Sequence, residues 1–453
     1  MRNLLSLLFI LVIVASALSQ DTERKSLSVT VYNNNLGVIK DNRIINIAKG
    51  VSTIKITDVA SGIDATSVHI GFDGNVLEQN YQYDLANLYK ILSKYIDKKI
   101  SLSDEKGNII TGSLITASGN QIVLRKSGGG LVMLPKIDNY KLSVPALPEG
   151  LITKPTLVWK VESNRNGKQD VELSYQTQGM GWHTEYIAVL NKDDSKMDFN
   201  AWVSIDNHSG GTYKNAKLKL VAGDVHRAEE TYMLDYAPKR TSSFDAQPLA
   251  PFQEKAFFEY HIYNLQHKTT IADNETKQIS LFEASNIKIK KKYNFTIKGI
   301  GESNHKANAS VVIEFLNAKN NNLGMPMPKG KVRLYKSDGE SIEFVGEDRI
   351  AHTPKNEKIK LRVGDAFDVI GKGRTVSKDR ISEKVFEYEF EFKIANRKDR
   401  DIIVDVENML WGEWKILNSS HKYVRKNANT VVYQVPVKSD SETLLTFRVR
   451  ISL

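Results

Sequence analysis

The residues whose types and spacing come nearest to a chemical site lie between positions 346 and 357. His352 is accompanied there by Asp348 and Glu357. An imidazole beside two carboxylates is a set that hydrolases use for general acid–base catalysis. The same side chains also cap backbone amides in turn-rich loops, and we favour that structural role. His352, Asp348 and Glu357 are therefore weak candidates for catalysis, and the loop is predicted to be structural.

Other chemical motifs are missing from the sequence. The chain has no cysteine, and its nine histidines include no pair at the spacing of zinc ligands. No Gly-x-Ser-x-Gly elbow occurs, and the glycines at 128–130 lack the Lys-Ser/Thr ending of a phosphate-binding loop. We therefore predict no cofactor and no metal ion.

Strands must position the candidate loop. Val332 and Leu334 alternate with polar residues before it, and Ile359 and Leu361 alternate with lysines after it. We expect Phe344 and Leu361 to be buried against one sheet, with Gly346, Asp348, Pro354 and Asn356 shaping the turn between them.

The same alternation runs through most of the chain. The clearest strand spans Phe386–Ile394, and residues 371–384 before it are predicted to be a loop of Gly, Lys and Ser. Trp159, Trp182 and Trp202 are expected in the core or at its rim. The predicted fold class is mainly β, with stacked β-sandwich domains.

Residues 84–145 differ from the rest. Asp84 is predicted to cap a helix in which Leu88, Leu92 and Tyr95 share a face, and five short strands follow. One helix and five strands suggest a small Sm-like or SH3-like barrel. Ser118 and Ile122 stand where an Sm barrel offers its RNA-binding Asp and Asn, so no nucleic-acid partner is predicted.

Composition shifts and prolines divide the chain into six predicted parts. They are a signal peptide at 1–19, a β unit at 26–83, the helix plus small barrel at 84–145, a β-sandwich at 155–225, a linker or long loop at 226–254, and a second β-sandwich at 255–453.

Residues 1–19 combine Arg2, an apolar run from Leu8 to Ala15 and small residues at Ala17 and Ser19. This pattern predicts a secretory signal peptide and a periplasmic or extracellular protein, with no transmembrane span once the signal is removed. The net charge of +10 allows peripheral contact with anionic envelope surfaces. The densest basic run, Lys288–Lys292, is predicted to be the solvated face of an edge strand.

Several segments resemble a known family. VGEDRIAHTP (Val345–Pro354), GDAFDV (Gly364–Val369) and MPKGKVRLY (Met327–Tyr335) are similar to the domain-of-unknown-function 4139 family, relatives of the mucoidy inhibitor A proteins. The resemblance extends through VELSYQTQGMGWHTEY, AWVSIDNHSGG and IANRKDRDIIVDV, and so covers the chain from about Pro155 onward. It implies an exported, β-rich bacterial protein with no assigned reaction, and it transfers no catalytic residue. Tyr213 departs from the tryptophan expected in the family.

Two functions follow from the sequence. The first is an exported, non-catalytic envelope or secreted protein that presents loops to a protein or glycan partner. The alternative is an extracytoplasmic hydrolase with its site near His352.

Overall fold

The structure is a computed structural model that describes residues 23–118, 121–134, 137–223, 252–257, 260–298 and 305–452. The predicted signal peptide lies outside these residues. So does the predicted linker, except for residues 252–254, which begin a strand. The described chain is mainly β, with stacked sheets and one α-helix, which confirms the predicted fold class. The described helices are all too short or too polar to cross a lipid bilayer.

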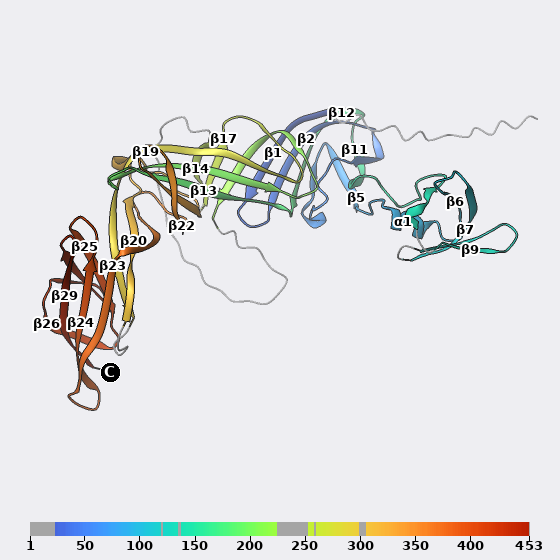
Figure 1. Cartoon of the computed structure of the whole chain (residues 1–453). Coiled ribbons are helices and arrows are strands. Elements are labelled where there is room, and N and C mark those ends of the chain that lie inside the picture. Colours follow the sequence, from blue (N-terminus) through green and yellow to red (C-terminus); the bar gives the residue numbers. More distant parts are fainter. Residues whose placement is uncertain are drawn as a thin grey trace, which may run out of the picture.

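Figure 1 shows three bodies in a row: a small unit around α1 at one end, a first sandwich in the middle and a second sandwich at the other end. One sheet of the first sandwich contains β1 (Glu23–Tyr32), β2 (Gly37–Ile47), β4 (His69–Gly71), β12 (Gly167–Thr177), β15 (Tyr213–Ala222), β16 (Phe252–Phe257), β17 (Tyr260–Leu265) and β18 (Thr269–Ile271). The facing strands are β13 (Met180–Leu190), β14 (Lys196–Asn207), β19 (Glu275–Lys298), β21 (Gly330–Ser337) and β22 (Ile342–Ile350). A three-stranded sheet of β3 (Gly50–Ile56), β5 (Gly74–Gln82) and β11 (Thr156–Ser163) adds to the same core.

The structure divides the chain differently from the sequence-based prediction at the N-terminus. β1 pairs in parallel with β15, and β2 pairs with β12, so residues 26–83 and 155–225 share one sheet. Pairing between strands this far apart in the chain leaves no local turn signal, which explains the difference. Trp159 and Trp182 are buried in the joint core as expected, whereas Trp202 is 37% exposed.

The small unit at 84–145 has its own core. Its helix α1 (Leu88–Lys94) is capped by Asn87, whose Oδ1 accepts the Lys90 N–H at 2.9 Å, so the predicted cap at Asp84 is wrong. The antiparallel sheet contains β10 (Lys141–Ser143), β6 (Lys99–Ser103), β7 (Ile109–Ser118), β8 (Gln121–Arg125) and β9 (Leu131–Leu134), in that order. Leu92 and Tyr95 pack into its core. Closure of this sheet into a barrel stays a prediction.

The second sandwich takes up the C-terminal part. One sheet runs β20 (His305–Leu316), β23 (Lys358–Arg380), β24 (Val385–Asn396), β29 (Ser441–Ser452) and β26 (Glu413–Ser419). The other joins the end of β19 to β25 (Ile402–Met409), β28 (Thr430–Val437) and β27 (Tyr423–Asn427). β23 continues to Arg380, so the loop predicted at 371–384 is largely strand. Gly371 lies under the Phe295 and Phe392 rings, where a β-carbon would come within 2.8 Å of Phe295.

Three strands belong to both sandwiches. Phe282 of β19, Ile313 of β20 and Leu361 of β23 lie in the first core, while Phe295 and Val369 on two of the same strands lie in the second. The two sandwiches therefore meet inside continuous strands, and not at the predicted boundary near residues 226–254.

Ion pairs lie at the joint, the region in which strands β19, β20 and β23 pass from the first sandwich to the second. Asp194, in the turn between β13 and β14, binds Lys291 at 2.8 Å, the Lys336 ammonium, and Arg400 of the second sandwich at 3.5 Å. Lys292 binds Glu314 at 3.2 Å and Asp405 at 3.3 Å. The basic run lies in β19, which pairs with β14 as far as Lys288 and with β20 from Ile289, so the predicted edge strand is wrong. Lys288 and Lys290 are nevertheless exposed, as a solvated face requires.

A buried asparagine ends the long strand β14. The Asn207 amide nitrogen donates to the carbonyl oxygens of Gly211 and Ala272 at 2.8 Å each, and its Oδ1 accepts the Ser209 N–H at 3.1 Å. One fully buried side chain thus holds two turns together.

Asn396 repeats this arrangement at the end of β24. Its amide nitrogen donates to Arg400 at 2.8 Å and Lys438 at 2.9 Å, and its Oδ1 accepts the Lys398 N–H at 3.1 Å. The surrounding pairings repeat as well, because β14 pairs with β19 and β15 with β18, while β24 pairs with β29 and β25 with β28. The two sandwiches therefore share this arrangement of strands around a buried asparagine.

Asn396→Ala should destabilise the chain by about 3 kcal/mol, because it leaves buried carbonyl and amide groups of two turns without partners. Chemical denaturation measures the change, with Asn320→Ala at an exposed position as the control. A loss below about 1 kcal/mol would contradict the role of this asparagine.

The pH dependence of stability in an Asp194→Asn variant tests the ion pairs that lie where the two sandwiches meet. Burial raises the pKa of Asp194, but hydrogen bonds from Lys291 and Lys336 lower it more, so its pKa lies below the ordinary value. The stabilisation is therefore complete above the unfolded pKa of about 3.9 and is lost as pH falls through the folded value. The variant should lose about 3 kcal/mol at neutral pH and show a flatter loss of stability below pH ~4. Melting curves across pH test this, and parallel profiles for the two proteins would refute it.

Candidate functional site

Two of the three predicted candidate residues bind backbone amides. Asp348 lies within β22, where its two carboxylate oxygens accept the N–H groups of Arg362 at 2.7 Å and Arg349 at 2.8 Å. His352 Nδ1 accepts the Lys329 N–H at 3.2 Å, and the Glu357 side chain is exposed. Asp348 and His352 thus hold backbone amides, which is the structural role favoured from the sequence.

The loop itself is shorter than predicted. β22 extends to Ile350, so residues 351–357 alone connect it to β23. Asn317, a buried residue that the sequence did not single out, donates to the Pro354 and Met325 carbonyl oxygens at 2.9 and 2.8 Å. Gly346 is required by the close approach of two strands, because a β-carbon there would collide with the Val363 carbonyl oxygen.

Phe344 is not buried as expected. Leu334 pairs with Gly346 and Tyr335 with Phe344, so Val345 is an extra residue in β22. One extra residue reverses the side-chain direction beyond it. Phe344 is 55% exposed with its ring against Tyr335, whereas Leu361 is fully buried.

A more promising site lies where β19 and β20 separate. β19 pairs with β20 from Ile289 to Asn294 and with β25 from Tyr293 to Lys298. β20 stays with β23 in the opposite sheet. The two strands thus form a fork, and a hollow of about 570 Å³ lies within it.

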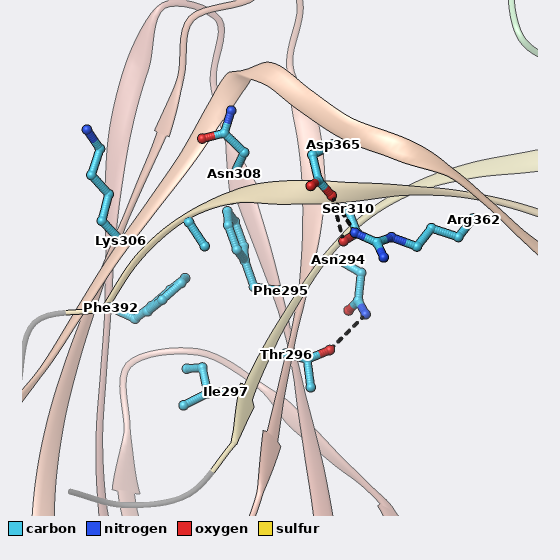
Figure 2. Close-up of a pocket in the computed structure, with 11 residues that line it drawn as sticks. Asn294, Phe295, Thr296, Ile297, Lys306, Asn308, Ser310, Arg362, Asp365 and Phe392 are labelled. Carbon is cyan, nitrogen blue, oxygen red and sulfur yellow. Dashed lines mark hydrogen bonds and ion pairs between the residues drawn. The ribbon is translucent and has the colours of Figure 1, made fainter. Parts of the chain in front are cut away.

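The hollow is lined by both apolar and polar side chains (Figure 2). Phe295 and Phe392 meet edge to face with ring centroids 5.1 Å apart, and Ile297 and Ala307 line the same region. The remaining lining residues are polar or charged: Asn294, Thr296, Lys306, Asn308, Ser310, Arg362 and Asp365.

The only carboxylate among the lining residues is already bound. Asp365 Oδ1 accepts the Ser310 hydroxyl at 3.1 Å and an Arg362 N–H at 3.0 Å. Lys306 has no ion pair with the residues that the structure describes. The Asn294 Oδ1 atom is buried and accepts no hydrogen bond from the described part of the chain. These groups suit polar recognition of a ligand better than proton transfer.

One rim of the hollow is a wide bulge in β23. Asn308 pairs with Ile370 and Ser310 with Asp365, so a step of two residues on β20 faces a step of five on β23. The Asn308 amide holds the bulge by donating to the Ala366 carbonyl oxygen at 3.0 Å. Phe367 projects from it and is 87% exposed. GDAFDV is one of the segments that carry the family resemblance, but its alternation gives no sign of a bulge.

Comparisons with known proteins add no relative. No protein-family model and no curated protein matches this chain. Within the described residues, no group of three or more His, Cys, Asp or Glu side chains is arranged to hold a metal ion.

Three variants test the roles of the residues around the loop. Leu361→Ala should cost about 3 kcal/mol by opening a cavity, whereas Phe344→Ala and His352→Ala should each cost about 1 kcal/mol or less. Thermal and chemical unfolding measure all three. A Phe344 variant as unstable as the Leu361 variant would contradict the exposed position of that ring.

Proposed function

We propose that this chain is an exported, non-catalytic β-protein similar to the domain-of-unknown-function 4139 family, which holds a protein or glycan partner in the periplasm or outside the cell. The partner binds at the fork between β19 and β20. The observation that carries the proposal is the lining of the hollow, where two amides, two hydroxyls, two cationic groups and one carboxylate surround an apolar floor of Phe295 and Phe392.

The position of the hollow supports this role. It lies beside the joint at which three strands pass between the sandwiches, so its walls belong to extended sheets and not to a single loop. Sites built on sheets keep their geometry better than sites on isolated loops. The bulge adds an exposed aromatic side chain, Phe367, of the kind that anchors protein interfaces.

The net charge of +10 favours anionic surroundings such as an envelope surface, which would raise the local concentration of the protein near its partner. Nucleic acid is not among the proposed partners, because an exported chain meets little of it. The hydrolase alternative predicts instead that His352→Ala abolishes turnover of an ester, glycoside or phosphate substrate while the fold remains stable.

Filling the hollow should remove partner binding. We expect Ala307→Phe to place a ring among Phe295, Ile297 and Phe392, and to reduce capture of the partner from envelope fractions at least tenfold. Immobilised wild-type and variant proteins, compared by quantitative mass spectrometry and on an array of envelope polysaccharides, measure the loss.

Ser382→Phe, in the exposed turn between β23 and β24, is the matched control and should bind like wild type. Melting curves establish that both variants are folded. Equal capture by the folded Ala307→Phe variant and by wild type would overturn the proposed site.

A further inference from the structure

The fork leaves two strand edges facing each other. Beyond Asn294, β19 has β25 on one side and no strand on the other, within the described residues. Residues 305–309 of β20 likewise have β23 on one side alone. A free strand edge carries a row of unpaired N–H and C=O groups, which is a template for another strand.

We propose that the fork binds an extended peptide segment of a partner protein by strand addition, with apolar and acidic residues alternating along that segment. This inference rests on the proposed function, because it uses the same hollow, and it names the chemical class of the ligand.

The backbone geometry favours a peptide over a glycan. Strand edges repeat their donors and acceptors at the spacing of another strand, about 3.3 Å per residue. A peptide matches that repeat along its whole length, whereas a sugar chain matches it only by chance.

The side chains define the pattern of the segment. Successive residues of a bound strand point to opposite faces. On the inner face, the half-buried Ile297 and Ala307, which pack against the buried rings of Phe295 and Phe392, offer an apolar surface for every second residue. On the outer face, Lys306 and Asn308 are exposed, and the Lys306 ammonium has no ion pair among the described residues. An acidic residue between two apolar ones therefore satisfies both faces.

Another edge strand of the same sandwich shows the contrast. All of β27 is exposed, but Arg425 stacks over the Trp414 ring at 4.5 Å and Lys426 binds Glu407 at 2.7 Å. Charged side chains along an edge discourage strand addition. In the fork, the small residues Ala307 and Ala309 alternate with polar ones, and the one charged side chain used here, Lys306, has no ion pair among the described residues, so an acidic residue of an added strand can pair with it.

The test uses the purified full chain and a fluorescein-labelled hexapeptide of alternating Val and Glu. Fluorescence anisotropy should give saturable binding of this peptide. Binding should be at least tenfold weaker for the alternating Val and Lys peptide, and for a Val and Glu peptide with alternate backbone nitrogens methylated. Comparable binding of the methylated peptide would overturn strand addition.

Two protein variants locate the site. Lys306→Glu should weaken binding of the acidic peptide at least tenfold and improve binding of the basic one. Lys415→Glu makes the same charge change on β26, the opposite edge of the same sheet, and should leave both affinities unchanged. Equal effects of the two substitutions would refute the placement.

The outcomes separate this inference from the proposed function. If the Ala307→Phe variant loses capture of the envelope partner but wild type binds no peptide, the peptide inference is overturned and the proposed site stands. Competition by a polysaccharide but not by the peptide would also overturn the inference, in favour of a glycan. If the Ala307→Phe and Lys306→Glu variants both capture the partner as well as wild type does, the proposed binding site and the peptide inference are both overturned.

Discussion

The structure depends on the continuity of β19, a single strand of 24 residues that contributes to two hydrophobic cores. Leu281 and Ile287 lie in the first core, and Tyr293 and Phe295 lie in the second, with no turn between them. Because the strand is paired along its length, the position of one sandwich constrains the position of the other. The ion pairs of Asp194 and Lys292 add electrostatic contacts at the point where the strand passes between the cores.

The fork is a local departure from the repeat that the two sandwiches share. In the first sandwich, β1 and β2 pair from Glu23 to Val31, and β1 lies parallel to β15 in the same sheet. In the second, the end of β19 lies parallel to β25 in the equivalent way, but β20 has left it for the opposite sheet. The hollow arises because β19 and β20 separate in the second sandwich, whereas β1 and β2 stay paired in the first.

Sequence patterns predicted the parts of this fold that depend on local alternation. Phe390, Phe392 and Ile394 are buried as their spacing required, and the short strands after α1 follow the predicted order. The patterns failed where an extra residue in a strand changes the face on which the following side chains lie. The extra residue Val345 turns Phe344 toward solvent, and the bulge at 366–369 exposes Phe367. The predicted linker or long loop at 226–254 does not mark the point where the sandwiches meet, because they meet within the continuous strands β19, β20 and β23.

The candidate site was equally hard to predict. Asn294 and Lys306 are ordinary strand residues, and only the separation of β19 from β20 gives them a shared surface. Asn207 and Asn396 look like common turn residues, since Ile-x-Asn is all that their neighbourhoods share in sequence. Their role depends on carbonyl groups more than 40 residues away in the chain, at Ala272 and Lys438.

The strands common to both cores also set the order in which the chain can acquire its structure during synthesis. Leu361 of β23 belongs to the first core, although it follows most of the chain in sequence. The apolar faces of β1 and β2 are synthesised first. Their core is therefore complete only after residues near Leu361 have been synthesised. Contacts of such long sequence separation form slowly and leave hydrophobic strands uncovered in the interval. A growing chain of this architecture therefore leaves apolar strand faces uncovered until the segment around Leu361 has been made.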